Sequence, residues 1–93
     1  MIMNKQEFLT SAGLQVEMLE FWLEQRWLIP DETAAEISFS DRDVARAHLI
    51  RDLKSDFGVN DEGIDVILHL VDQLHGLRQA LEQLQVGLQG RAR

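Results

Sequence analysis

The sequence contains no cysteine, no tyrosine and only one proline, Pro30. Without cysteine the chain can form no disulfide, no thiolate nucleophile and no cysteine-ligated zinc site. Basic residues are also scarce, because nine lysines and arginines stand against sixteen aspartates and glutamates, for a formal net charge of −7. Such a charge repels nucleic acid and anionic membrane surfaces, and it favours a basic partner.

Long hydrophobic runs are absent as well. No stretch is apolar for long enough to span a membrane, and residues 1–7 lack the apolar segment of a secretion signal. We therefore expect a soluble, cytoplasmic protein with no membrane partner. The 93 residues are enough for a single domain, and the 45% hydrophobic content with two tryptophans indicates a folded chain.

Side chains arranged for catalysis or metal binding are missing too. His69 and His75 are six positions apart, which is not the three- or four-residue spacing of a metal-binding pair on a helix. The only other histidine is His48. The serines lie in no nucleophile motif, and no glycine-rich loop resembles a phosphate-binding loop. We expect no enzyme activity, no cofactor, no metal and no small-molecule substrate.

The first third of the sequence has helical patterns. Residues 5–12 predict a short helix that ends at Gly13, a residue typical of helix C-termini. Residues 15–26 predict a second helix, in which Val16, Leu19 and Leu23 form one apolar stripe. Two short helices joined by a tight turn have the outline of a helix-turn-helix.

The helical pattern is lost around Pro30. Residues 30–33 predict a turn, and Glu36–Phe39 alternates as a short strand does. We expect Trp27–Ile29 to pair with that strand as a small two-stranded wing that leans on the helices. Ser40, with an acid three positions later, then predicts the start of a third helix that runs to about Phe57.

The last helix, which Asn60 or Asp61 caps, has the most regular pattern. Its large apolar residues are spaced alternately three and four apart, which is the heptad pattern of a coiled coil. They are Ile67, Leu70, Leu74, Leu77, Leu81, Leu84 and Leu88. We expect Leu74, Leu77, Leu81, Leu84 and Leu88 to form a homodimer interface. The alternative is that they pack on the short helices of the same chain. The predicted domains are therefore 1–60 and 61–93.

Residues 13–30 resemble the second helix and the start of the wing in MerR-type regulators, whose pattern is roughly G-V-S-x-R-T-L-R-Y-Y-x-x-x-G-L-L-x-P. The apolar, aromatic and proline positions match at Leu19, Phe21, Trp22, Leu28 and Pro30. Residues 39–44 and 49–60 look like the family's third helix and the segment after it. The resemblance covers nearly the whole chain. It implies an all-α, MerR-like winged helix-turn-helix with a small two-stranded wing and a long C-terminal coiled-coil helix.

The sequence departs from that pattern where the family approaches DNA. Glu17 and Glu20 occupy the positions of the two helix arginines, and residues 37–39 of the expected wing contain no basic residue. Phosphate contacts supply much of the affinity for DNA, so this surface is expected to repel it. The carboxylates then form either an ordinary solvated helix face or a binding face for a basic protein.

In its length, its acidity and its coiled coil, the chain is similar to the CbpM-type chaperone modulators, which are short MerR-like proteins. The resemblance implies a protein that binds and restrains the J-domain of a DnaJ-like co-chaperone, which presents a basic helix. We expect the acids of the second helix and the wing to make the contact, with one of the two tryptophans as an aromatic anchor. They are Glu17, Glu20, Glu24, Asp31, Glu32, Glu36, Trp22 and Trp27. The other place for each tryptophan is the core under the wing.

Two other functions stay open. A DNA-binding MerR-like regulator would use a basic cluster on the third helix, which Asp43 and Asp52 dilute. The cluster consists of Arg42, Arg46, Arg51 and Lys54. The other possibility is an adaptor or antitoxin-like protein with a different protein partner.

Overall fold

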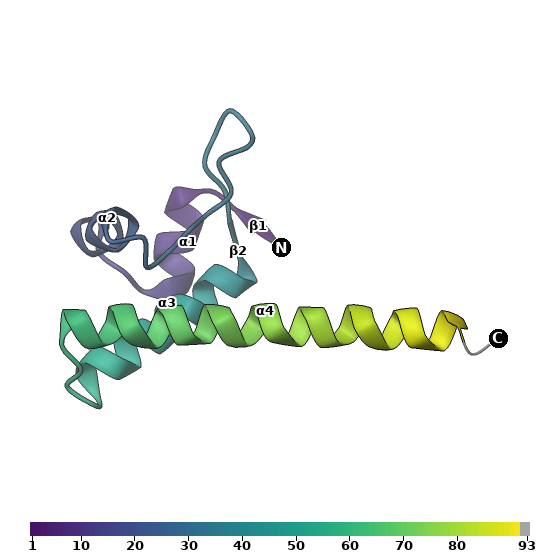
Figure 1. The fold of residues 1–93 in the computed structure, drawn as a ribbon. Helices are drawn as coiled ribbons and strands as arrows, with labels where there is room; N and C mark the ends of the chain where they lie inside the picture. Colours follow the sequence, from purple (N-terminus) through teal and green to yellow (C-terminus); the bar gives the residue numbers. More distant parts are fainter. Residues whose placement is uncertain (92–93) are drawn as a thin grey trace. The chain divides into compact units, whose positions relative to one another are not determined.

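The computed structural model describes residues 1–91. The elements along the chain are β1 (Ile2–Met3), α1 (Lys5–Ala12), α2 (Val16–Glu24), β2 (Phe39–Ser40), α3 (Asp41–Ser55) and α4 (Asp61–Arg91) (Figure 1). Contacts within the chain divide it into two compact units, Met1–Asn60 and a second unit that begins at Asp61. The first unit contains the helix-turn-helix, and the second consists of α4.

Helix α1 has the bounds that its sequence predicts. Asn4 caps it, since the Asn4 side chain accepts a hydrogen bond from the Glu7 amide at 2.8 Å. The Glu7 carboxylate accepts one from the Asn4 amide at 2.9 Å in return, which completes a capping box. Gly13 ends the helix with a φ of 67°, the left-handed conformation in which glycine has no side chain to strain.

Helix α2 is shorter than predicted, because it ends at Glu24 rather than Arg26. Its buried arc centres on Leu19 and Trp22, whereas Val16 at the edge of the predicted stripe is 41% exposed. The expected stripe of Val16, Leu19 and Leu23 is therefore only partly buried. The reason is that Trp22, one turn beyond Leu19, moves the centre of the arc away from Val16.

The sheet has two antiparallel strands, but they are not the predicted ones. Strand β1 pairs with β2, with Ile2 opposite Ser40 and Met3 opposite Phe39. The expected pairing of Trp27–Ile29 with Glu36–Phe39 is wrong. The chain between α2 and β2 closes instead through a single bridge, in which the amides and carbonyls of Asp31 and Ser38 exchange hydrogen bonds of 3.0 and 2.9 Å. We call residues 31–38 the wing loop.

Helix α3 starts where the sequence predicts, at a capping box made by Ser40 and Asp43. The Ser40 amide donates to the Asp43 carboxylate at 2.9 Å. The helix ends at Ser55, two residues before the predicted end, and Gly58 follows with a φ of 64°. The amide of Val59 bonds the carbonyl of Leu53 at 2.9 Å, so the turn satisfies a backbone group that the end of the helix leaves open.

Aromatic side chains form the centre of the first unit. Phe8 of α1 stacks on Phe39 of β2, with ring centroids 4.2 Å apart, and this contact attaches the sheet to the first helix. Trp22 and Trp27 lie beside each other at 6.4 Å. The core around these rings also contains Met3, Leu9, Ala12, Leu19, Leu28, Ala47 and Ile50.

Helix α4 is a continuous helix of 31 residues. Ile64 and Leu68 in its first turns are buried, but the heptad leucines that follow are about half exposed, with Leu74 at 49% and Leu77 at 59%. The others in this exposed row are Leu70, Leu81, Leu84 and Leu88. In the part of the chain described here, no helix combines the length and hydrophobicity needed to cross a membrane.

Candidate functional site: the acidic face of the helix-turn-helix

The exposed side of α2 carries a row of carboxylates. Glu17, Glu20 and Glu24 are spaced three and four residues apart, which places them on one face of the helix. Burial of Leu19 and Trp22 on the opposite side turns this face toward solvent, and all three glutamates are exposed. No lysine or arginine lies within α2. The core therefore fixes the direction of a negatively charged surface, which we call the acidic face.

One of these carboxylates has an internal partner. The Lys5 ammonium lies 3.5 Å from a carboxylate oxygen of Glu20, and both side chains are largely exposed. A surface ion pair of this kind contributes little to stability, on the order of 0–1 kcal/mol. Glu17 and Glu24 make no ion pair with any side chain that the structure describes, those of residues 1–90. Their charges are available to a partner.

The wing loop adds three exposed carboxylates, those of Asp31, Glu32 and Glu36. Asp31 is the most constrained, since its carboxylate accepts a 2.7 Å bond from the Thr33 hydroxyl and a 2.9 Å bond from the Thr33 amide. These bonds, the hydroxyl bond foremost, hold the pKa of Asp31 below its usual value. Asp31 thus stays charged further into acidic conditions than a free aspartate.

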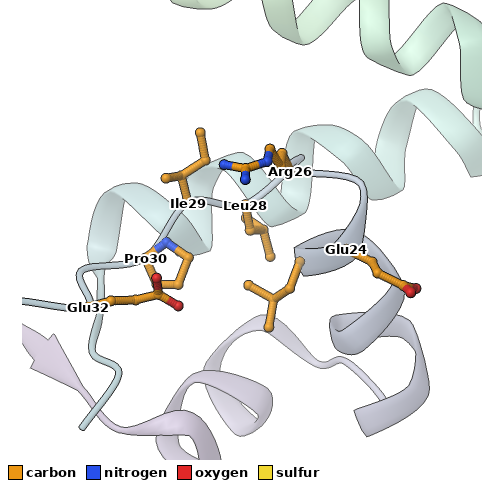
Figure 2. A pocket seen from close by; sticks show the side chains of 7 residues that line it. Glu24, Arg26, Leu28, Ile29, Pro30 and Glu32 are labelled. Carbon is orange, nitrogen blue, oxygen red and sulfur yellow. The ribbon is translucent and has the colours of Figure 1, made fainter. Parts of the chain in front are cut away.

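A shallow hollow of about 250 Å³ joins α2 to the wing loop (Figure 2). Glu24 and Glu32 both line it, and in Figure 2 the Glu24 carboxylate points away from the other labelled side chains. Its apolar lining comes from the end of α2 and the segment that follows. These residues are Leu23, Leu28, Ile29 and Pro30. Arg26 lines the same hollow.

The tryptophans do not reach this surface. Trp22 is 2% exposed and Trp27 is 1% exposed, so the prediction that they anchor a partner is wrong for the folded unit. Both are core residues because of where they lie relative to α2. Trp22 faces inward on α2, and Trp27 follows the end of the helix, where its ring meets the edge of Phe21 at 5.6 Å. Packing of the two indoles fills the space under the wing.

Three exposed apolar side chains take the place of the tryptophans at the surface. Met18 is 42% exposed, Phe21 36% and Ile29 66%. Met18 follows Glu17 and Phe21 follows Glu20, and both lie on α2 outside the centre of the buried arc. Their distance from the glutamates in the sequence does not identify them, because Leu19, which is also next to Glu20, is fully buried.

Most cations of the basic cluster of α3 are partly buried and lie against other residues of the first unit. The Arg46 guanidinium donates a hydrogen bond to the Trp27 carbonyl, and the Lys54 ammonium lies 5.6 Å from the centre of the Trp27 ring. The Arg51 guanidinium packs against Gly13. Of the four cations, only Arg42 is classed as exposed. Arg46 and Lys54 thus attach α3 to Trp27, whereas the buried Nη2 of Arg51 has no hydrogen-bond partner within the described part of the chain.

Across the described residues, no group of three or more histidine, aspartate or glutamate side chains is placed to hold a metal ion.

Residues 3–86 match the family described as MerR HTH family regulatory protein. The chain belongs to the MerR helix-turn-helix family. None of the curated proteins matches it as an individual relative.

Membership in the MerR family accounts for the architecture. The winged helix-turn-helix and the long C-terminal helix are the fold that the sequence predicts, and the match covers both units. In this MerR-family chain the exposed side of α2 is acidic, whereas the pattern quoted above has arginines at positions 17 and 20.

Proposed function

We propose that this MerR-family protein binds the J-domain of a DnaJ-like co-chaperone and restrains its activity, without enzyme chemistry of its own. The observation that supports the proposal most is the charge of α2. The outward face of this helix presents Glu17, Glu20 and Glu24, and the helix has no cation of its own, although Lys5 of α1 pairs with Glu20. Such a face attracts a basic helix and repels phosphate.

The electrostatic contribution is best described as steering. Each exposed charge pair across such an interface contributes on the order of 0–1 kcal/mol, but several carboxylates of one sign raise the rate of encounter with a basic surface. The carboxylates of the wing loop, Asp31, Glu32 and Glu36, extend the negative field beyond the helix. Because the carboxylates are spread over α2 and the wing loop, this field favours a partner with an extended basic surface over a single cation.

Apolar contacts would supply the part of the binding energy that electrostatic steering does not. Met18 and Phe21 are partly exposed next to the carboxylates, and Phe21 is braced by the edge contact with Trp27. A braced aromatic side chain loses little conformational entropy on binding, and aromatic residues contribute much of the energy of protein interfaces. The acidic face is thus a mixed surface, with charges around a small apolar centre.

A binding measurement tests this proposal. Titration calorimetry of the protein with a purified J-domain is expected to show binding, and the double substitution Glu17→Lys with Glu20→Lys should weaken it at least tenfold. Glu82→Lys is the matched control, because Glu82 is an exposed glutamate of α4 outside the acidic face. Unchanged affinity in the double variant would exclude this face, and no binding by the unmodified protein would exclude the function.

We also propose that the protein is a homodimer through α4. The heptad leucines are about half exposed, and they form one row along several turns of the helix. An exposed row of leucines with coiled-coil spacing is stabilised when it packs against a second such row. Leu77→Asp with Leu84→Asp should convert a dimer to a monomer in light scattering. Gln79→Asp should not, because Gln79 is exposed and is not part of the leucine row. A monomeric unmodified protein at tens of micromolar would contradict the dimer.

The family match favours one competing function, a DNA-binding regulator. That function needs phosphate contacts, and the charged side chains of α2 are all carboxylates. Fluorescence anisotropy with labelled duplex DNA at low salt separates the two functions. We expect no binding there, whereas submicromolar, salt-sensitive binding to DNA would favour the regulator.

A further inference from the structure

Arg26 has an unusual backbone conformation. Its φ is 61°, and it is the only non-glycine residue with a positive φ in the described range 1–91. The other two residues with positive φ are Gly13 and Gly58. Arg26 closes α2, since its amide bonds the Leu23 carbonyl at 3.1 Å and the next amide, of Trp27, bonds the Trp22 carbonyl at 2.9 Å. Glycine is the usual residue at this position of a helix end, because a side chain there is strained.

The two closing hydrogen bonds hold the backbone in this conformation, but no contact of the Arg26 side chain adds to them among the residues described. Arg26 is exposed, and its guanidinium makes no hydrogen bond or ion pair with the residues described, although Glu24 and Glu32 line the same hollow. Figure 2 shows the Arg26 side chain extended along the hollow and the Glu24 carboxylate turned away from it. Non-glycine residues held in strained conformations concentrate at binding and catalytic sites, where function compensates for the strain.

The surroundings of Arg26 suggest what it would bind. The hollow beside it is lined by apolar side chains, and Ile29 at its edge is 66% exposed. Arg26 is also the only cation in the hollow, between the carboxylates of α2 and those of the wing loop. A guanidinium next to an apolar surface fits a carboxylate with an apolar neighbour, because its planar fork donates hydrogen bonds to both carboxylate oxygens at once.

We propose that Arg26 binds a carboxylate of the protein partner, and that the hollow beside it holds an apolar side chain next to that carboxylate. The inference rests on the proposed function and specifies the partner more narrowly. The acidic face attracts basic surfaces in general, while Arg26 repels those that are basic throughout. Only a basic surface with one carboxylate at this place satisfies both, so Arg26 acts as a specificity residue.

The substitution Arg26→Gly separates strain from binding. Removal of the strained side chain should raise the melting temperature by about 4–8 °C. The same change should weaken the affinity for the J-domain at least tenfold. General electrostatics predicts the opposite sign, because loss of a cation makes the protein more acidic and should strengthen its attraction to a basic partner. A gain in stability with a loss in affinity is therefore diagnostic of a direct contact.

The controls use the same calorimetric titration. Arg26→Lys keeps the charge without the fork and should give an affinity between those of the unmodified protein and Arg26→Gly. Arg42→Ala removes an exposed arginine of α3 and should leave the affinity unchanged. If Arg26→Gly binds as tightly as the unmodified protein while Glu17→Lys with Glu20→Lys loses binding, the inference about Arg26 is overturned and the proposed function stands. If the unmodified protein binds no J-domain, both are overturned.

Discussion

Asp31 shows how a single side chain shapes the wing loop. Its carboxylate accepts two hydrogen bonds from Thr33, which bridge the first turn of the loop. This local turn, rather than a second strand, sets the direction in which the chain leaves Pro30. The wing loop is therefore held by short-range hydrogen bonds and by the bridge between Asp31 and Ser38.

The charge of Asp31 can be measured directly. Its pKa lies below the usual value, so its charged form adds stability at neutral pH, and that stability is lost as the pH falls through the lowered pKa. The substitution Thr33→Val removes the hydroxyl bond and leaves the amide bond. We expect the titration midpoint of Asp31 in NMR spectra to rise toward the usual value without reaching it. A midpoint that does not move would show that the hydroxyl bond is absent in solution.

Gly13 is the residue that the turn of the helix-turn-helix requires. Its φ of 67° strains any side chain, and an added Cβ would lie 3.3 Å from a nitrogen of the Arg51 guanidinium. Gly13→Ala should therefore lower the free energy of unfolding by about 1–2 kcal/mol. Urea denaturation followed by circular dichroism measures this loss. A variant as stable as the unmodified protein would mean that the turn adopts another conformation.

The sequence predicts some of these residue roles better than others. The exposure of Glu17, Glu20 and Glu24 follows from their spacing, because a charged row opposite Leu19 has to face solvent. The burial of Trp22 and Trp27 does not follow, since tryptophan is equally suited to a core and to an interface. For Trp27 the outcome depends on where α2 ends, and the sequence places that end two residues too late.

At the level of elements, helices are predictable where their ends carry specific residues. Capping boxes begin α1 and α3 at the expected residues. Strand β1 was not anticipated, because a two-residue strand has no periodicity to detect. Its partner is about 37 positions away in the sequence, with Ile2 opposite Ser40. The stacking of Phe8 on Phe39 accompanies this pairing, and only the folded chain reveals it.

Helix α4 contains a glycine that gives it no visible advantage. An added Cβ at Gly76 would meet nothing within 4 Å, and Gly76 lies one position before Leu77, off the row of heptad leucines. Gly76→Ala should stabilise the helix by about 1 kcal/mol, because alanine loses less backbone entropy than glycine in a helix interior. Helicity at 222 nm and the melting temperature should both rise. A fall in either would place Gly76 in a close contact between helices.

At the scale of the whole molecule, the net charge of −7 governs how the protein meets a partner. Association with a basic J-domain should slow several-fold as the salt concentration rises from about 50 to 200 mM, because salt screens the attraction between the two surfaces. Stopped-flow measurement of the association rate tests this. Dimerisation through leucines should change little over the same range, and an association rate that is independent of salt would argue against steering by carboxylates.

The placement of the aromatic residues makes the two units separately observable. Both tryptophans are buried in the first unit, and the sequence from Asp61 onward contains no phenylalanine, tyrosine or tryptophan. Indole fluorescence therefore reports unfolding of the helix-turn-helix alone, whereas circular dichroism also follows the 31-residue helix α4. If the two signals change at different urea concentrations, the chain does not unfold as a single two-state system. The protein thus needs no added label to show which unit a ligand or a substitution stabilises.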